Sequence, residues 1–371
     1  MTSQKCWTVA YTRPIQYDIV NTEGIFDPSN LALLSGTKDS GSARFVVVDS
    51  AVYDLHESAI HQYFLQNALT AKIIRFVAGE ENKSLSAYQH VALALDAFPV
   101  DRRSEPLIAI GGGVLTDLVG FVASTYRRGI PHIKVPTTLM GYVDAAIGIK
   151  TGVNFNHHKN RLGSFEPPLQ VILDRHFLTS LPRRHLLNGV AEIIKLAVIS
   201  DASLFEQLEN AGLSSLNACF QNEAGAAILD DSITGILKYL EPNLYEEDLA
   251  RALDFGHTFS PAFEMKAEGA LLHGEAVIIG VVICSALAYL RGWLSLHDFN
   301  RILALIHTLG LPVDLQYLCP TLMKNALIER THHRNGQQNV PLPQGIGHCA
   351  FANDLTDNDL AAVCHFLLQE T

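Results

Sequence analysis

The hydrophobic pattern of the first half of the chain predicts strands that alternate with helices. Apolar runs rich in β-branched residues at 43–49, 71–77 and 106–110 are typical of buried strands. The stretches that follow the first two, to about Gln66 and from Ser84 to Phe98, have helical periodicity. Strands that alternate with helices predict a parallel sheet covered on both faces. Loops at the carboxyl ends of such strands are the usual places for ligands.

The pattern changes after Leu181-Pro182 to long apolar helical periods. We expect helices over 188–199, 202–211, 224–240, 273–291 and 355–369, with few β-rich runs between them. We therefore divide the chain into an α/β domain, residues 1–182, and a mainly α-helical domain, residues 183–371. We find no sign of repeats at a fixed spacing.

Composition and charge limit the classes of binding partner and the cellular compartment that we expect for this protein. The formal net charge of −11 argues against a nucleic-acid partner, which requires a basic surface. The six cysteines form no C-x-x-C pair, which favours free thiols in a reducing cytoplasm. Charges at Lys5, Arg13 and Asp18 exclude a secretory signal in the first thirty residues. The longest apolar run, 276–290, stops at Arg291 before it reaches membrane-spanning length, so we expect no membrane partner.

Three consecutive glycines suggest a phosphate-binding loop. Gly111, Gly112 and Gly113 follow the third predicted strand and precede a helix expected from about Thr116. Glycines let the backbone approach a pyrophosphate, and a helix N-terminus adds amide donors and a favourable dipole. A plain tight turn is the alternative. Asp49, at the end of an earlier strand, could bind the ribose hydroxyls of a nucleotide.

Further loops carry polar groups close to glycines. The loop 79–84 contains Glu80 and Lys83, although a capped helix start explains it equally. Residues 135–154 and 159–163 are dense in small and polar side chains, which favours a ligand-binding loop. Eight basic residues fall within about sixty positions of this acidic chain and indicate either a phosphorylated ligand or a solvated basic face: Arg127, Arg128, Lys134, Lys150, Lys159, Arg161, Arg183 and Arg184.

Three distant segments contain residue types that bind a catalytic zinc ion. Glu192 lies on a predicted helix, His257 in a Gly-His-Thr segment, and His273 at the start of an apolar helix. Carboxylate and imidazole are usual zinc ligands. However, Glu192 also shares a helix face with Lys195, as in an ordinary ion pair. With sixteen histidines in the chain, sequence spacing alone does not assemble a metal site.

Eight ordered motifs resemble those of the sugar phosphate cyclase superfamily, whose best-known member is 3-dehydroquinate synthase. They are GGGVLTD, YRRG, PTTL, the 144–150 stretch, KNRLG, NGVAEIIK, GHTFSP and HGEAV, and the resemblance covers residues 43–369. It implies a dehydroquinate synthase-like fold. In that fold a Rossmann-like parallel sheet binds NAD, and the mainly helical C-terminal domain binds metal and substrate.

The resemblance also implies roles for individual residues. The metal, Zn²⁺ or Co²⁺, would be held by Glu192, His257 and His273. The substrate would contact Lys150, Asn160, Lys195 and Lys238, with Arg128 reaching its phosphate from the neighbouring subunit of a homodimer. NAD would be surrounded by Asp49, Glu80, Lys83, Gly112, Gly113, Asp117, Thr137, Thr138, Asp144 and Lys159.

The residues that differ from those of dehydroquinate synthase are at positions expected to lie near the substrate. Pro261 replaces a second histidine, Asp254 replaces an asparagine, and residues 331–336 replace a basic pair. These features resemble the branch that cyclises sedoheptulose 7-phosphate. Asp254 and His333 resemble the 2-epi-5-epi-valiolone synthases within it, where each side chain can hydrogen-bond a substrate hydroxyl.

The implied reaction is a phosphate-eliminating lyase reaction. It comprises transient oxidation by NAD, loss of phosphate, reduction, ring opening and an intramolecular aldol addition. Alternatives on the same substrate are desmethyl-4-deoxygadusol synthase and valiolone synthase. Further alternatives are 3-dehydroquinate synthase, a metal-dependent polyol dehydrogenase and a non-catalytic NAD-binding descendant.

Overall fold

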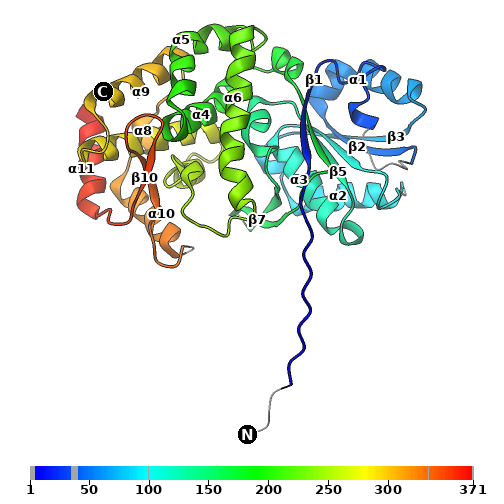
Figure 1. The fold of residues 1–371 in the computed structure, drawn as a ribbon, viewed down its shortest axis with the longest axis horizontal. Helices are drawn as coiled ribbons and strands as arrows, with labels where there is room; N and C mark the ends of the chain where they lie inside the picture. The colour runs from blue at the N-terminus through cyan, green and yellow to red at the C-terminus, as the bar shows by residue number, and fades with distance from the viewer. Residues whose placement is uncertain (1–4, 35–40, 99, 157, 333, 370–371) are drawn as a thin grey trace.

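A six-stranded parallel sheet forms the first half of the protein in the computed structural model, which describes residues 5–34, 41–98, 100–156, 158–332 and 334–369. The strand order is β1-β8-β5-β4-β2-β3. The strands are β1 (Asp18–Thr22), β2 (Ala43–Asp49), β3 (Thr70–Phe76), β4 (Leu107–Gly111), β5 (His132–Pro136) and β8 (Gln170–Asp174). Figure 1 shows this sheet beside a larger helical half.

Helices cover both faces of the sheet, as a parallel sheet requires. Helix α1 (Ser50–Gln66) packs on one face, where Tyr63 and Phe64 contact strand residues such as Val46. Helices α2 (Leu85–Asp96) and α3 (Gly113–Thr125) pack on the other face against Phe45 and Val47. Neighbouring side chains of β2 thus point to opposite faces and enter two separate apolar clusters.

A short π-helical turn and a hairpin lead from the sheet to the helical half. The turn η4 (Gly141–Ala145) follows β5, and the antiparallel strands β6 (Lys150–Phe155) and β7 (His158–Phe165) follow the turn. Single π-helical turns occur frequently at functional sites. Both elements come from the segment that the sequence predicted as a ligand-binding loop.

The second half consists of packed helices and one small hairpin. In chain order they are α4 (Arg183–Ser200), α5 (Ala202–Asn217), α6 (Glu223–Leu240), α7 (Ser260–Lys266), α8 (His273–Leu290), α9 (Leu296–Leu309), α10 (Pro320–His332), β9 (Val340–Pro343), β10 (Cys349–Ala352) and α11 (Asp357–Gln369).

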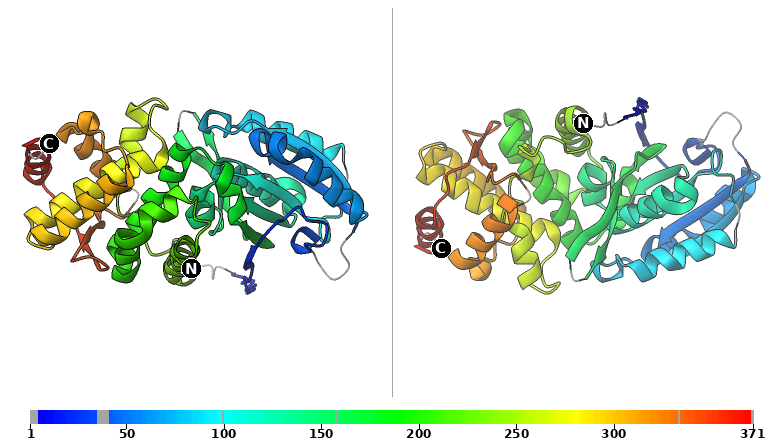
Figure 2. Two further views of the ribbon diagram at one scale, coloured as in Figure 1. Left: turned by 90° about the horizontal axis from the view of Figure 1, so that it is seen from above. Right: turned by 90° about the horizontal axis from the view of Figure 1, so that it is seen from below.

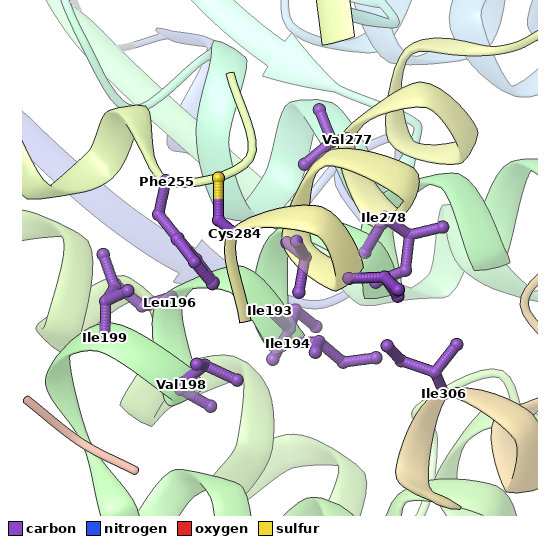
Figure 3. Close-up of a cluster of buried hydrophobic side chains, with 14 of the residues drawn as sticks. Ile193, Ile194, Leu196, Val198, Ile199, Phe255, Val277, Ile278, Cys284 and Ile306 are labelled. Atoms are coloured by element: carbon purple, nitrogen blue, oxygen red, sulfur yellow. The ribbon is translucent and has the colours of Figure 1, made fainter. Parts of the chain in front are cut away.

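Helix α8 is the centre of this half. Contrary to the expectation from the sequence, it is long and apolar enough to cross a membrane, with a mean hydropathy of 1.8, but 83% of it is buried inside the protein. It packs against α4, and the side chains between them form the cluster in Figure 3, which includes Ile194, Ile278 and Cys284. Burial on every side therefore explains its uninterrupted apolar sequence.

One glycine of α8 sets its distance from the chain segment beside it. A Cβ atom on Gly280 would lie 2.0 Å from the carbonyl oxygen of Gly256, so only glycine fits there. Gly256 itself has φ of +78°, a conformation that also favours glycine. This close approach holds the residue before His257 directly against α8.

Most of the predicted elements are present with small shifts. The predicted strand 43–49 coincides with β2, and the other two strands differ by one residue at each end. The helix expected from Thr116 begins earlier, at Gly113, so the third glycine is already part of α3. Strands β1, β5 and β8 were not predicted. In β5 the buried side chains of His132 and Lys134 interrupt the apolar run that marks a central strand.

Candidate active site

Three side chains from separate segments meet beside α8. Glu192 projects from the middle of α4, His257 follows the turn η7 (Ala252–Asp254), and His273 is the first residue of α8. The Nε2 atoms of the two histidines are 3.2 Å apart. Oε1 of Glu192 is 3.7 Å from Nε2 of His257 and 3.5 Å from Nε2 of His273. One ligand atom from each residue thus lies within 4.8 Å of the others.

The hydrogen bonds around this cluster orient both imidazole rings toward its centre. Nδ1 of His257 is 3.1 Å from the carbonyl oxygen of Phe255, and Nδ1 of His273 is 2.9 Å from Oε1 of Glu264. A carbonyl and a carboxylate only accept, so each Nδ1 carries a hydrogen. In the neutral form of each ring the lone pair is then on Nε2. Two inward-facing lone pairs and a carboxylate are a donor set that fits Zn²⁺.

Burial and neighbouring charges shift the pKa values of all three side chains in the cluster. Burial alone would raise the pKa of Glu192, but Lys195 and the nearby histidines hold it well below its ordinary value. Burial and Lys195 lower the pKa of His257 to about 4. Burial also acts to lower the pKa of His273, but hydrogen bonds to Glu192 and Glu264 outweigh it and raise the pKa to about 10. A metal ion must therefore displace a proton from His273.

The positive charge of Lys195 offsets the negative charges of nearby carboxylates. Its ammonium group forms a buried ion pair with Glu192, one helical turn earlier. Burial lowers its pKa, but the charges of Glu192 and Asp144 outweigh burial and leave the pKa above its ordinary value. A small cavity lies between these three side chains, and its wall also contains Ser232 and Leu253. The arrangement places a fixed positive charge beside the candidate metal site.

Glu264 joins the metal cluster to the other half of the protein. Its carboxylate on α7 contacts His273 and forms an ion pair with Lys159 on β7. Burial would raise the pKa of Glu264, but the contacts with His273 and Lys159 lower it to about 2. The sequence placed Lys159 beside NAD, and the structure brings its ammonium group to a residue that orients a candidate metal ligand.

The glycine loop lies at the carboxyl end of β4, against the segment that follows β5. Gly112 precedes α3 directly, and a Cβ atom there would be 3.0 Å from the side chain of Thr138. A Cβ atom on Gly113 would be 3.0 Å from Ala145 in η4. A side chain at either position would require these neighbours to shift. The amides of Leu115 and Thr116 donate to the carbonyl oxygen of Gly112, and the amides that precede them at this helix N-terminus could bind an anion.

The other predicted NAD residues surround this loop. Asp49 caps α1 through one carboxylate oxygen, which accepts from the amides of Ala51 and Val52. Lys83 donates to Asp117 at 2.6 Å and to Asn160 at 2.5 Å. Glu80 accepts from Asn154 at 2.8 Å, Thr137 is buried after β5, and Asp144 is in η4. Burial raises the pKa of Asp144 above its ordinary value.

Asp254 occupies a more basic environment than the sequence indicated. Its carboxylate contacts the guanidinium groups of Arg251, Arg330 and Arg334. Burial would raise its pKa, but these arginines hold the pKa well below the ordinary value. An ionised carboxylate therefore gathers three cations near His257.

The remaining predicted substrate residues differ in their placement. Lys150 begins β6 and is 2.8 Å from Glu246, which also pairs with Arg251. Lys238 is exposed in the last turn of α6. His333 lies outside the described residues.

Arg128 lies far from the glycine loop of its own chain. It follows the C-terminus of α3, whose thirteen residues correspond to about 20 Å. It therefore lies at the opposite end of the strands from the glycine loop. Its side chain is exposed and its φ is +64°. Within one copy Arg128 therefore cannot reach a ligand at the glycine loop.

The eight basic residues between 127 and 184 do not form one patch. Lys134 is fully buried and donates to the carbonyl oxygen of Gly148 at 2.9 Å, and burial lowers its pKa to about 8. Arg184 pairs with Glu275 at the start of α8. Proximity in the sequence was thus a poor guide to proximity in space.

Sequence reasoning missed four residues of the site: Glu264, Arg251, Arg330 and Arg334. Two weak signals were available. Glu264 lies seven residues after His257 on a helical stretch, and Arg251 is three residues before Asp254. Arg330 and Arg334 come from a segment almost eighty residues later, and only the tertiary structure brings them to Asp254.

Comparison with known proteins identifies the family of this chain. The family models described as 3-dehydroquinate synthase N-terminal and C-terminal match residues 73–188 and 189–333. A 2-epi-5-epi-valiolone synthase from an Actinoplanes species is 45% identical over 96% of this chain and 92% of its own. A demethyl-4-deoxygadusol synthase from Trichormus variabilis is 34% identical over 94% of this chain and 86% of its own.

A solved structure has the same fold over nearly the whole chain. It is the 2-epi-5-epi-valiolone synthase ValA from Streptomyces hygroscopicus subsp. jinggangensis, with NAD⁺ and Zn²⁺ bound. The TM-score is 0.94 at 41% identity, and the match covers 98% of this chain and 100% of the other. The chain belongs to the 3-dehydroquinate synthase family of sugar phosphate cyclases. The family and the fold predicted from the sequence are thereby confirmed.

Replacement of Glu264 by glutamine should weaken metal binding. Glutamine keeps the size of the side chain but removes the charge that orients His273 and makes it basic. Loss of such a partner typically lowers metal affinity by about 10- to 100-fold. The dissociation constant for Zn²⁺, measured by competition with a chromogenic chelator, tests this. Lys159→Met is the control, because it leaves the contact between Glu264 and His273 intact and should retain higher affinity than Glu264→Gln. Equal affinity of wild type and Glu264→Gln would contradict this role.

Replacement of Asp254 by asparagine should destabilise the protein in a pH-dependent way. At neutral pH three guanidinium groups would lose their counterion, at a cost of about 3 kcal/mol. Because the folded pKa lies below the unfolded value near 3.8, the carboxylate stabilises fully above that pH. Its contribution is lost as the pH falls toward the folded pKa, so the two proteins should then converge in their free energies of unfolding.

Urea denaturation of wild type and Asp254→Asn at several pH values measures this difference. Asp357→Asn removes an exposed partner of Lys324 and should change the free energy of unfolding by less than about 1 kcal/mol. A difference between wild type and Asp254→Asn that does not shrink as the pH falls below about 3.8 would refute the expectation.

Proposed function

We propose that the protein is a 2-epi-5-epi-valiolone synthase. It would convert sedoheptulose 7-phosphate to 2-epi-5-epi-valiolone and inorganic phosphate, as a carbon–oxygen lyase. The observation that carries this proposal is the 45% identity to a protein of that name over 96% of the chain. The convergence of Glu192, His257 and His273 supports it, because the centre needed for the reaction is present.

This chain would bind two cofactors, a metal ion and NAD. Zn²⁺, or Co²⁺ in its place, fits between Glu192, His257 and His273, whose lone pairs converge. NAD would lie across the glycine loop, where a side chain at Gly112 or Gly113 would crowd neighbouring residues and the N-terminus of α3 would face the diphosphate. When bound, the metal supplies a Lewis acid to neighbouring hydroxyl groups, and NAD accepts a hydride and later returns it.

The side chains around these positions would hold an anionic substrate. Lys195 is a fixed cation beside the metal ligands, and burial on all sides excludes water from it. Lys150 and Lys238 would add further cations, and Asn160 is oriented by Lys83. Such preorganised charges stabilise developing negative charge on phosphate and enolate oxygens. The phosphate of the substrate can itself accept the proton that must be removed.

Asp254 would select the substrate branch. We infer that its carboxylate both accepts from a substrate hydroxyl and fixes Arg251, Arg330 and Arg334 in one orientation. A buried polar partner discriminates strongly against ligands that leave it unpaired. His333 would contribute a second hydrogen bond.

We further propose a homodimer in the cytoplasm. Arg128 lies at the opposite end of the strands from its own glycine loop. This position supports the expectation that it completes the phosphate site of a neighbouring subunit. Residues 1–182 would form the NAD-binding unit and residues 183–371 the metal- and substrate-binding unit. The six cysteines are free thiols in the described structure, which fits a reducing compartment.

Incubation with sedoheptulose 7-phosphate, NAD and Zn²⁺ or Co²⁺ tests the proposed reaction. We expect stoichiometric phosphate release, no net NADH, and a product whose mass and NMR spectrum are those of 2-epi-5-epi-valiolone. Demethyl-4-deoxygadusol or another valiolone isomer would keep the substrate and overturn the product. Turnover of the dehydroquinate synthase substrate alone, or accumulation of NADH on a polyol, would overturn the substrate or the reaction.

Variants of the metal cluster belong to the same assay. Glu192→Gln and His273→Ala should abolish turnover together with metal content, whereas His297→Ala, an exposed histidine on α9, should leave both unchanged. Asp254→Ala should slow or redirect product formation. Full activity with bound metal in Glu192→Gln would refute the assignment of the ligands.

A further inference from the structure

Lys134 is buried within the sheet and takes no part in the proposed reaction. It lies in the middle of β5, where its neighbours Ile133 and Val135 point to the face covered by α1. Because successive side chains of a strand point to opposite faces, Lys134 points to the face covered by α3 and the β6–β7 hairpin. Its ammonium group donates to the carbonyl oxygen of Gly148 at 2.9 Å.

The ammonium group of Lys134 has no carboxylate partner among the described residues. Asp117 acts on it through its charge, but the carboxylate of Asp117 forms its ion pair with Lys83. Burial outweighs this charge and lowers the pKa of Lys134 to about 8. A buried cation without an ion-pair partner is destabilising, and an apolar side chain of similar size is often no less stable in its place. A contribution to folding is therefore a poor explanation for a lysine at this position.

The carbonyl oxygen that Lys134 contacts belongs to the turn that leads into β6. Three consecutive carbonyl oxygens of this turn accept hydrogen bonds from separate parts of the chain. The carbonyl oxygen of Ile147 accepts from the hydroxyl of Tyr17 at 2.7 Å. That of Gly148 accepts from Lys134, and that of Ile149 accepts at 2.8 Å from the backbone amide that follows β7. The turn is thus fixed to the body of the protein at three successive residues.

Lys150, which we expect to contact the substrate, follows this turn directly. Its backbone begins β6, but its side chain is exposed and extends to Glu246 in the helical half, with 2.8 Å between Nζ and Oε1. Both views of Figure 2 show that the segment from β5 to β7 lies at the boundary between the sheet and the helices. A lysine side chain is flexible, so the direction in which it extends depends on how firmly the backbone before it is held.

We propose that Lys134 is a positioning residue for Lys150, and that it acts by fixing the carbonyl group of Gly148 in the turn from which Lys150 extends. Tyr17 supports the same turn through the preceding carbonyl oxygen. The π-helical turn η4 needs no such support, because its carbonyl oxygens accept from amides of the same segment. This inference rests on the proposed function, since it takes Lys150 as a residue that binds the substrate.

Lys134→Met tests this role, because methionine has a similar shape and cannot donate a hydrogen bond. We expect kcat/KM for sedoheptulose 7-phosphate to fall by about 10- to 100-fold, as a small misplacement of a substrate-binding group can cause. The midpoint of urea unfolding and the affinity for Zn²⁺ should not decrease. Tyr17→Phe removes only a hydroxyl group and should lower kcat/KM by a smaller factor.

His132→Met is the matched control for Lys134→Met. His132 lies on the same face of β5, is fully buried, and has no hydrogen-bond partner for either ring nitrogen among the described residues. Because it does not contact the turn before β6, its replacement should leave kcat/KM unchanged. A loss of kcat/KM in His132→Met as large as that in Lys134→Met would show a general effect of the strand and would overturn the proposal.

A double-mutant cycle separates the positioning of Lys150 from any other effect of Lys134. In a Lys150→Met background, the further change Lys134→Met should alter kcat/KM by less than about twofold, because no ammonium group is left to misplace. An equal loss of kcat/KM in both backgrounds would overturn the proposal. Wild-type kcat/KM in the single variant Lys134→Met would also overturn it.

The chemical reactivity of Lys150 provides a test that needs no turnover. Its amine is held in an ion pair, so acylation by acetic anhydride should become about two- to fivefold faster in Lys134→Met and in Tyr17→Phe, the range expected from loss of an exposed ion pair. Peptide mass spectrometry gives the rate for each lysine, and Lys324, an exposed lysine in another ion pair, is the internal control.

The acylation rates keep this proposal distinct from the proposed function. An unchanged rate at Lys150 in both variants would overturn the positioning role, whether or not the protein is a cyclase. A faster rate at Lys150 with an unchanged rate at Lys324 would support it. If the wild type at the same time fails to turn over sedoheptulose 7-phosphate, the proposed function is wrong and the positioning of Lys150 by Lys134 still holds.

Discussion

The buried carboxylate of Glu192 is the constraint on which the rest of the site depends. It lies in the middle of α4, where nearly all neighbours are apolar, and an ionised group there is stable only with compensating charges. Lys195 on the same helix supplies one of these charges. The imidazoles of His257 and His273 lie on the other side of the carboxylate. Those imidazoles can arrive only if α8 begins at His273 and the Gly256 segment runs directly against Gly280. The close packing of Gly256 on Gly280 thus helps to place His257 beside this carboxylate.

The site also depends on contacts between the two halves of the protein. The Lys159–Glu264 ion pair joins the β6–β7 hairpin to α7, and Glu264 in turn orients His273. On the other side, Asp144 in the π-helical turn lies near Lys195 on α4. The metal cluster is therefore held from both halves and lies beside the carboxyl ends of the strands, where parallel sheets bind their ligands. A change in the relative position of the halves would reach the candidate metal ligand His273 through the carboxylate of Glu264.

The substrate side is built from charges that offset one another. Asp254 gathers three arginines, and Glu246 links Arg251 to Lys150. A network of this kind holds long cationic side chains in defined positions. We propose that this network selects the substrate. Its central residue Asp254 and the 331–336 segment are separate from the candidate metal ligands, which are on α4, α8 and the loop between them.

Sequence alone determined those features that depend on local periodicity. It predicted β2, β3 and β4, the main helices and the glycine loop, because an apolar run or a 3.6-residue period is visible within a short window. It missed β5, since buried His132 and Lys134 break the run, and it grouped Arg128, Lys134 and Arg184, which the fold separates. The motif resemblance pointed to His257 and His273 beside Glu192, but only the tertiary structure shows that these side chains meet and that Arg330 and Arg334 surround Asp254. These contacts join residues 60 or more positions apart in several cases, and no local pattern encodes which distant partner a folded chain will bring to a buried charge.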